Sequence, residues 1–343
     1  MTKLRPLSAC RLAAGISCLL LAPWVHGQTL GTDFSSSYTV NSLGSVPSLP
    51  TNYGGLTFLN GNTLLIGGAA NGATGSLYTI DVTRNATNHI TGFVGTATRY
   101  LGAAALIGEY NDGGVLFGPG GVLFTARWPI NSLGQTKPGS TNEDKVIELG
   151  PLGVASSLSA LNFVPAGQGG AGQLKMVSYS GGEWYSGSLS ADGSGTFNIN
   201  GLTQVDLNGA VAGIQNVPGG PEGFVYIASG NPGFAANSML ISEYQAGVVG
   251  AYAVDGEGNP LVATRRTFLS GLTGAEGAVI DPLTGDFLFS TFGGTNRVVV
   301  VSGFLAPPPT PDPTPTPIPE PETYALMLAG LGLLGAVARR RRR

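Results

Sequence analysis

An internal repeat of strand-like segments limits the possible folds of this chain more than any other feature. A strongly apolar stretch is followed by a Gly-rich turn, a second apolar stretch and then Gly or Asn. Four segments share this order: "GGLTFLNGNTLLIGGAANG", "SALNFVPAGQGGAGQLKMVSYSGG", "AGIQNVPGGPEGFVYIASGN" and "EGAVIDPLTGDFLFSTFGGTN". A fifth, "ALIGEYNDGGVLFGPGGVLFTARW", fits less closely. With Leu56, Leu106, Leu161, Ile214 and Ala278 taken as equivalent, the steps are 50, 55, 53 and 64 residues.

A period near 50 residues with about four strands in each unit predicts an all-β fold, the β-propeller. Later strand-like pieces such as "SLYTIDV", "DKVIEL" and "NRVVVVSGF" supply the remaining strands of each unit. One four-stranded blade cannot cover both of its faces, so blades stack around an axis, and a closed ring leaves only short edges. The alternatives are a β-sandwich, which would not repeat at this spacing, and a β-helix, which repeats on a much shorter one.

The repeats predict about five four-stranded blades. A sixth would require a further blade within residues 84–105 or 240–270. The last repeat is short, about 33 residues from Leu272 to Phe304. The segment "GTDFSSSYTVNSL" near the start of the chain is left over and is strand-like. We therefore expect an N-terminal strand to complete the last blade and close the ring.

Composition supports a folded, extracellular β-rich body. The chain has 55 Gly, only 11% charged residues and 42% hydrophobic residues, which suits strands and turns around a sizeable core. Between residues 28 and 305 there are nine Lys or Arg against seventeen Asp or Glu, a net charge of about −8. An acidic body argues against nucleic acid as a partner.

The N-terminal residues 1–27 have the layout of a secretory signal peptide. Basic residues precede an apolar stretch from Leu12 to Leu21, and small residues then precede a cleavage point before Gln28. The alternatives are a buried N-terminal helix and lipidation at Cys18. Both cysteines of the chain, Cys10 and Cys18, lie in this leader, so the mature protein is expected to contain no thiol and no disulfide.

The C-terminal region is a linker followed by a short apolar segment and a basic end. Residues 306–318 alternate Pro with small residues and predict an extended, semi-rigid spacer. Thr323 to Ala338 gives sixteen mostly apolar residues, or about 24 Å as a helix, which is short for a membrane span of about 30 Å. We expect a short transmembrane helix here, with the arginine-rich end in the cytoplasm and the body outside.

Residues 319–343 resemble a PEP-CTERM sorting signal. The resemblance rests on Pro319, Glu320 and Pro321, the following "ETYALMLAGLGLLGAVA", and the terminal Arg339, Arg340, Arg341, Arg342 and Arg343. It implies export across the inner membrane of a Gram-negative bacterium and processing near Pro-Glu-Pro by an exosortase. Proteins of this kind come from bacteria that often make exopolysaccharide or a biofilm matrix. The alternative is an ordinary tail anchor.

The propeller, predicted over residues 28–305, lacks the side chains of the common catalytic sites. Once the leader is removed, His89 is the only histidine, so a cluster of histidines on a metal cannot form and a catalytic triad would need this one residue. His89 stands in a polar stretch and is expected to be an exposed surface residue. Asp281 and Asp286 are expected to form turns. No catalytic residue is predicted.

Candidate binding residues gather at one end of the predicted blades. The loops before each first strand share a face with the loops between each second and third strand. By the alignment above, Glu276 enters the last blade near the axis on this face. The other candidates are Arg127, Trp128, Glu183, Trp184, Asn231 and Asn296. Trp with acids and amides suits sugars, because an aromatic face stacks on the ring and polar groups bond its hydroxyls.

The stretch "IDPLTGDFLFSTFGGTNRVVVV" resembles blades of NHL and gluconolactonase-like propellers. Gluconolactonase-like enzymes hold a divalent metal with a Glu and Asn or Asp ligands, so the resemblance implies such a role for Glu276. No cofactor is assigned, and Ca²⁺ is the one candidate. The rest of that ligand set has no match, so the metal ligands stay unassigned. Two functions remain open: a non-catalytic surface or matrix protein that binds exopolysaccharide or surface proteins, which the sequence favours, and a metal-dependent lactonase-like hydrolase.

Overall fold

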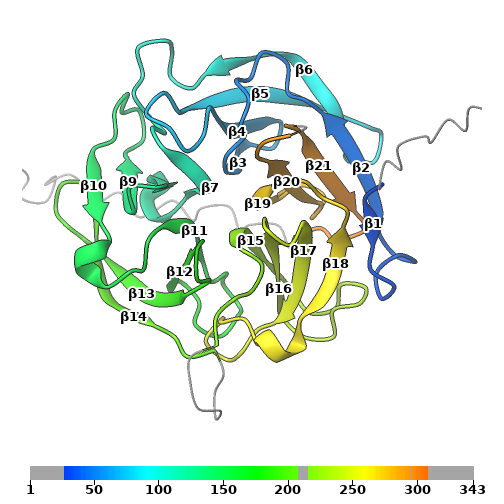
Figure 1. Ribbon diagram of the computed structural model, residues 1–343. Helices are drawn as coiled ribbons and strands as arrows, with labels where there is room; N and C mark the ends of the chain where they lie inside the picture. Colours follow the sequence, from blue (N-terminus) through cyan, green and yellow to red (C-terminus); the bar gives the residue numbers. More distant parts are fainter. Residues whose placement is uncertain (1–26, 208–214, 295, 308–343) are drawn as a thin grey trace, which may run out of the picture.

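The computed structural model describes residues 27–207, 215–294 and 296–307. Within these ranges the chain forms five antiparallel sheets arranged in a ring around a central axis (Figure 1). Each sheet is one blade, and the first strand of each blade lies beside the axis. The structure therefore confirms the all-β propeller predicted from the repeat and fixes the number of blades at five.

The strands follow the chain from blade to blade. Blade 1 contains β3 (Leu56–Asn60), β4 (Thr63–Gly68), β5 (Ser76–Arg84) and β6 (Ile90–Arg99). Blade 2 contains β7 (Asn111–Phe117), β8 (Leu123–Arg127), β9 (Ser132–Thr136) and β10 (Lys145–Glu148). Blade 3 contains β11 (Leu158–Phe163), β12 (Leu174–Ser178), β13 (Trp184–Ala191) and β14 (Phe197–Gln204).

The last two blades also use strands from the start of the described chain. Blade 4 contains β15 (Pro221–Ile227), β16 (Ser238–Glu243), β17 (Val248–Ala253), β18 (Arg266–Ser270) and the added β1 (Thr29–Leu30). Blade 5 contains β19 (Ala275–Ile280), β20 (Phe287–Thr291), β21 (Val298–Ser302) and β2 (Thr39–Gly44). The helices of the described ranges are three short 3₁₀ turns: η1 (Pro119–Gly121), η2 (Gly150–Leu152) and η3 (Val262–Thr264).

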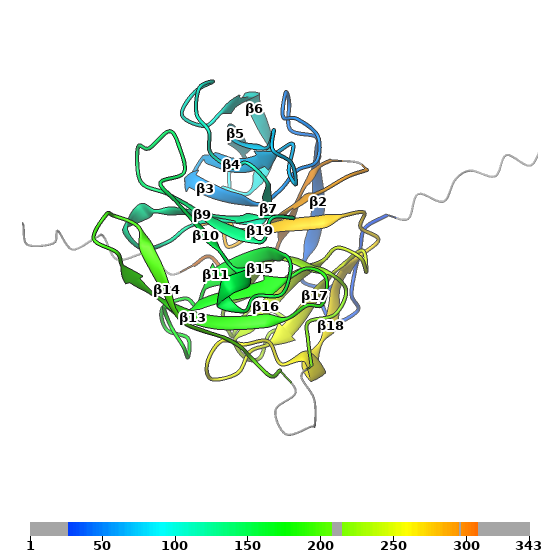
Figure 2. The same ribbon diagram turned by 60° about the vertical axis from the view of Figure 1, so that its left-hand side comes forward.

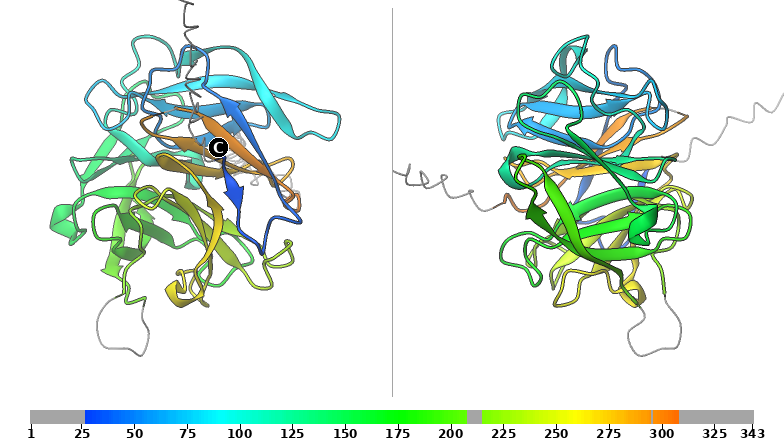
Figure 3. Two further views of the ribbon diagram at one scale, coloured as in Figure 1. Left: turned by 45° about the vertical axis from the view of Figure 1, so that its right-hand side comes forward. Right: turned by 90° about the vertical axis from the view of Figure 1, so that its left-hand side faces the viewer.

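The N-terminal strands close the ring, as the short last repeat predicts. Strand β2 pairs antiparallel with β21, with Val40 opposite Val301, and so completes blade 5. Strand β1 pairs with the outer edge of β18 in blade 4, which the sequence did not indicate. Figure 3 shows the blue N-terminal strands beside the orange last strands of the propeller. The start of the described chain is thereby joined to its last two blades, and the outer edges of β18 and β21 are paired.

The hydrophobic core consists of five clusters, one between each pair of adjacent blades. Between blades 5 and 1, for example, Val298 and Val300 of β21 pack against Leu64 and Ile66 of β4, all fully buried. Apolar residues cover both faces of the middle strands because each blade is enclosed between two others. This explains the nearly continuous apolar stretches that mark the repeats.

Polar contacts to buried acids also connect blade 1 to blade 5. Arg84 at the end of β5 donates to both carboxylate oxygens of Asp281, which is fully buried. Nearby, His89 Nδ1 lies 2.6 Å from Asp286 Oδ2, so His89 is a partly buried contact between blades rather than a free surface residue. Asp281 does also form the expected turn, accepting from the backbone nitrogen of Leu283.

The register of two repeats differs from the sequence alignment. The alignment places Leu106 in a first strand, but this residue is 56% exposed and precedes β7, which begins at Asn111. The alignment on Ile214 falls outside the described residues, and the first strand of blade 4 is β15, which begins at Pro221. The ranges considered for a sixth blade hold β6 and β16 to β18, which belong to blades 1 and 4.

Four glycines bring the inner strands together at the axis. A Cβ on Gly55 would lie 2.7 Å from the Gly113 carbonyl oxygen, and one on Gly113 would lie 2.8 Å from the Gly223 nitrogen. Gly223 makes an equally close approach to Gly277, and Gly277 to Gly55. Figure 1 shows β3, β7, β15 and β19 around the centre of the ring, and Figure 2 shows the same strands in a turned view. Only glycine permits backbones this close, so the axis is filled at this level.

The membrane and sorting segments lie outside the described residues. The predicted signal peptide, most of the linker, the expected transmembrane helix and the terminal arginines all fall there. Within the described ranges no helix is long and apolar enough to cross a membrane. The boundaries at residues 27, 305 and 318 stay predictions.

Candidate ligand-binding site

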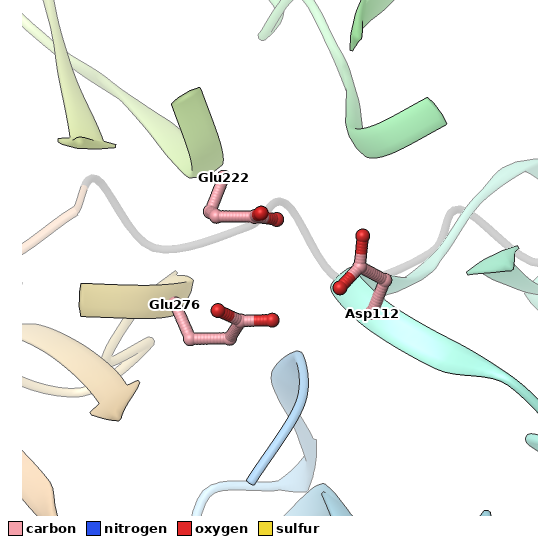
Figure 4. A group of neighbouring side chains, drawn as sticks. All are labelled: Asp112, Glu222 and Glu276. Atoms are coloured by element: carbon pink, nitrogen blue, oxygen red, sulfur yellow. The ribbon is translucent and has the colours of Figure 1, made fainter. Parts of the chain in front are cut away.

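Three of the five inner strands carry an acid as their second residue, directly before a glycine. Asp112 lies in β7, Glu222 in β15 and Glu276 in β19. At each of these places the pairing with the next strand shifts, as in a β-bulge, which can re-aim a side chain. The three carboxylates point toward one another from three blades (Figure 4). We call Asp112, Glu222 and Glu276 the carboxylate triad.

The carboxylate triad is buried and tightly grouped. Asp112, Glu222 and Glu276 are 1%, 4% and 1% exposed, and one oxygen from each lies within 4.8 Å of the others. One oxygen of each side chain, Asp112 Oδ2, Glu222 Oε2 and Glu276 Oε1, has no hydrogen-bond partner. Buried acceptors without partners destabilise a fold. The triad therefore points to a role other than stabilising the propeller.

Burial keeps protons on the triad. Burial raises the pKa of Asp112 to about 7, although hydrogen bonds with Glu276 and Asn71 act in the opposite direction. Burial and then the charge of Asp112 raise the pKa of Glu222 well above its usual range. Burial and the charges of Glu222 and Asp112 do the same to the pKa of Glu276. No Lys, Arg or His in the described ranges contributes to these shifts.

Asn71 fixes one side of the triad. Its amide, oriented with the nitrogen toward Asp112, donates to Asp112 Oδ1 at 2.9 Å and to the carbonyl oxygen of Asn111 at 3.1 Å. The Asn111 amide in turn donates to the carbonyl oxygen of Gly108 at 2.7 Å. These bonds hold Asp112 in place and leave Oδ2 as its unpaired oxygen.

Aromatic side chains form a collar above the triad. Four blades place an aromatic residue directly after their second strand: Trp128, Tyr179, Tyr244 and Phe292. Together with Asn71, Glu222 and Glu276 they line a cavity of about 210 Å³, which we call the acid pocket. The rings of Tyr179 and Tyr244 meet edge to face with centroids 6.0 Å apart, and those of Tyr244 and Phe292 at 6.2 Å.

The charges of the triad raise the pKa values of two tyrosines in the collar. Burial raises the pKa of Tyr179, and the charges of Glu222, Glu276 and Asp112 raise it further. Burial and the charge of Glu276 also raise the pKa of Tyr244. Both phenols are therefore neutral near pH 7 and can donate a hydrogen bond. The acid pocket combines apolar ring faces with acceptors that lack partners, which is the composition of a small-molecule site.

The glycines at the axis form a floor behind the triad, because a Cβ on Gly113 would lie 2.9 Å from Glu222 Oε2. On their far side lies a second cavity of about 910 Å³, lined by residues such as Leu56, Val115, Ala278 and Leu305, and no residue lines both cavities. Of the triad, Glu222 and Glu276 line the acid pocket, and the glycine floor lies behind them. The two faces of the ring are thus separate surfaces.

The structure brings two of the seven predicted binding residues together. Trp128 and Glu276 both line the acid pocket. Arg127 directly precedes Trp128 in the chain but is buried. Its guanidinium lies 3.3 Å from Glu143 and 3.5 Å from Glu109. It supports the loop that carries Trp128.

The other four predicted residues lie elsewhere. Glu183 is in the loop between β12 and β13 and does not line the acid pocket. Trp184 is fully buried between blades 3 and 4, and its indole nitrogen donates to Asn259. Asn231 follows a first strand and lines the opposite cavity, where its side-chain oxygen accepts from the Leu305 nitrogen. Asn296 accepts from the backbone of Asn52 and is outside the lining.

Sequence reasoning missed Asp112 and Glu222. The signal was present, because "DGGV", "EGFV" and "EGAV" each place an acid and a glycine before a Val at the same spacing. In blade 3 the equivalent position is Ser159, whose hydroxyl donates to the Pro221 carbonyl oxygen at 2.7 Å. The acids thus mark three of five equivalent positions, and only the ring brings them together.

The C-terminal residues 317–343 match the PEP-CTERM protein-sorting motif. This confirms the motif predicted from Pro319, Glu320, Pro321 and the terminal arginines. The motif implies that this chain, with its propeller body, is exported and is held at the membrane before an exosortase processes it.

Several solved structures are similar to this chain at low identity. Myxococcus xanthus glutaminyl cyclase is 12% identical with a TM-score of 0.44, over 78% of this chain and 97% of that one. An auxiliary nutrient binding protein from Bacteroides ovatus is 9% identical with a TM-score of 0.42, over 78% and 76%. A protein described as a 6-phosphogluconolactonase from Bacteroides uniformis is 14% identical with a TM-score of 0.38, over 79% and 77%.

No curated protein sequence is significantly similar to this chain. One fold hosts many activities, and function belongs to the site rather than to the fold. The acid pocket is therefore the basis for a functional proposal.

Proposed function

We propose that the protein is an exported, non-catalytic binding protein whose propeller holds a small ligand in the acid pocket. One observation carries this proposal: three buried carboxylates with unpaired oxygens meet beneath a collar of four aromatic side chains. Burying three acids without basic partners destabilises the propeller. A bound ligand that donates hydrogen bonds to them would offset that loss.

The collar favours a ligand with a ring. Trp128 and Tyr244 offer faces on which a sugar ring can stack, and polar groups below can bond its substituents. Sorting by an exosortase agrees with a role at the cell surface or in the extracellular matrix. The partners that we propose there are exopolysaccharide and surface proteins. Because the body is acidic, we expect no nucleic acid among its partners.

The second candidate is a metal-dependent hydrolase of the lactonase-like kind. The triad fits a hard divalent cation such as Ca²⁺, because its three oxygens lie within 4.8 Å of one another and carboxylate oxygens are the preferred ligands. Asp112, Glu222 and Glu276 would hold the ion. A metal there would polarise a substrate carbonyl as a Lewis acid.

Tryptophan fluorescence of the intact exported protein separates binding from catalysis. Trp24 lies in the predicted leader, so Trp128 in the acid pocket and the buried Trp184 would report. We expect monosaccharides to change the emission of the wild type but not of Trp128→Phe, which retains Trp184 as an internal reference. The same samples, with and without Ca²⁺, should release no acid from added lactones in a pH-stat. Lactone hydrolysis that Glu276→Gln abolishes would overturn the binding role and support the hydrolase.

A further inference from the structure

We propose that the acid pocket recognises a protonated primary amine, and that its ligand is an amino sugar of one ring. This inference rests on the proposed binding function and names its ligand class. It starts from a numerical match, because a primary ammonium group has three N–H donors and the triad offers three unpaired carboxylate oxygens.

The spacing of the triad suits a single ammonium nitrogen. Charge-assisted N–H···O bonds have N···O distances of about 2.8 Å. Three acceptors arranged tetrahedrally around one nitrogen at that distance lie about 4.6 Å apart. One oxygen from each acid lies within 4.8 Å of an oxygen from each of the other two, so one nitrogen placed between these oxygens would be within hydrogen-bonding reach of all three acids.

The charge of the site also favours a cation from the ligand. In the described part of the chain, none of the ion pairs includes Asp112, Glu222 or Glu276. An arriving ammonium would stabilise the ionised carboxylates and displace the protons that burial keeps there. Binding is therefore expected to release protons and to strengthen as the triad ionises.

The collar fits the remainder of such a ligand. An ammonium group attracts aromatic faces, and the carbons of a sugar ring pack against them. The acid pocket has about 210 Å³, and a cavity of about 150 Å³ admits benzene. One six-membered ring with its substituents therefore fits. The glycine floor prevents a polymer from passing through the ring, so the ligand is a free amino sugar or the end of a chain.

The same features disfavour two other occupants. A neutral sugar brings hydroxyls but no charge to three buried acids. Calcium prefers six to eight oxygen ligands, whereas the triad presents three unpaired oxygens. The ammonium group needs only the three oxygens that the triad presents.

Titration calorimetry of the intact exported protein tests the inference. The probes are glucosamine, glucose, N-acetylglucosamine and CaCl₂, each at pH 5.5 and pH 7. We expect glucosamine to bind at least tenfold more tightly than glucose or N-acetylglucosamine, and more tightly at pH 7 than at pH 5.5. The heat should depend on the ionisation enthalpy of the buffer, because protons are released.

Matched variants locate the effect. Glu276→Gln and Glu222→Gln should each weaken glucosamine binding at least tenfold, while the exposed Glu257→Gln should leave it unchanged. Circular dichroism confirms that each variant is folded. If Glu276→Gln does not fold, Trp128→Ala, which alters the collar and not the triad, should weaken glucosamine binding instead.

The outcomes separate this inference from the binding function on which it rests. Equal binding of glucose and glucosamine, with altered Trp128 emission, overturns the inference and leaves the binding function standing. Tight binding of Ca²⁺ without glucosamine overturns the inference and favours the hydrolase. Failure of all three sugars to bind or to alter Trp128 emission contradicts both.

Discussion

Replacing Asp112 by Asn should stabilise the protein at pH 8 and leave its stability unchanged at pH 4. Asn has nearly the same shape, and its side-chain oxygen can still accept the bond from Asn71. In the wild type, burial raises the pKa of Asp112 from 3.8 to about 7. The native state therefore binds this proton more tightly than the unfolded chain. The stability that the proton provides is complete below pH 4 and is lost as the pH rises through about 7.

The size of this effect follows from the shift in pKa. Each pKa unit corresponds to about 1.4 kcal/mol, so a shift of Asp112 from 3.8 to about 7 is worth on the order of 4 kcal/mol. The asparagine side chain cannot ionise, so the variant does not suffer this loss. The free energy of unfolding of Asp112→Asn, relative to the wild type, should therefore rise by on the order of 4 kcal/mol between pH 4 and pH 8.

Urea unfolding of the intact protein, followed by circular dichroism, measures this difference at the two pH values. Glu257→Gln, at an exposed position, serves as the control. Its free energy of unfolding should differ from that of the wild type by the same amount at both pH values. If Asp112→Asn is less stable than the wild type at pH 8, or if its difference from the wild type does not change with pH, the triad is not held protonated by burial. The variant should also lose glucosamine binding, because one of three acceptors becomes a donor.

Three further predictions concern the ring and the tail. Replacing Arg84 by Met leaves the fully buried Asp281 without its charged partner and should lower the free energy of unfolding by about 3–5 kcal/mol in urea. Deleting residues 28–44 removes β1 and β2, so size-exclusion chromatography should find aggregates instead of a monomeric body; a well-folded monomer would contradict closure by β2. Mass spectrometry of the exported protein should find no peptide from Arg339 to Arg343, and Glu320→Ala should restore it; an intact wild-type tail would show that the segment is only an anchor.

The fold could be predicted because it is encoded many times in the sequence. Each repeat carries the same apolar stretches, and the unpaired strand near the start matches the strand missing from the last repeat. The register of two repeats could not be predicted in the same way. The acid-glycine pairs of β7 and β15 stand in "YNDGGV" and "PGGPEGF", which have the composition of turns. The repeat alignment therefore places these first strands too early, at Leu106 and Ile214.

This displacement explains why the sequence predicted only one of the three acids in the triad. The sequence identifies Glu276 because its repeat aligns correctly, whereas Asp112 and Glu222 have the surroundings of turn residues. The same displacement assigns Asn231 to the wrong end of blade 4, because it follows the first strand rather than the second. The prediction that Trp184 binds a ligand differs from the structure for another reason. It begins β13, and only the packing of blade 3 against blade 4 shows that its indole faces the core.

A crystal structure of the protein with glucosamine would show whether the triad recognises an ammonium group. We expect one sugar ring against Trp128 and Tyr244, with its amine nitrogen within hydrogen-bonding distance of Asp112, Glu222 and Glu276. A divalent cation on the three carboxylates with its coordination completed by water, or a sugar bound only in the opposite cavity beside Leu305, would contradict recognition of an amine by the triad.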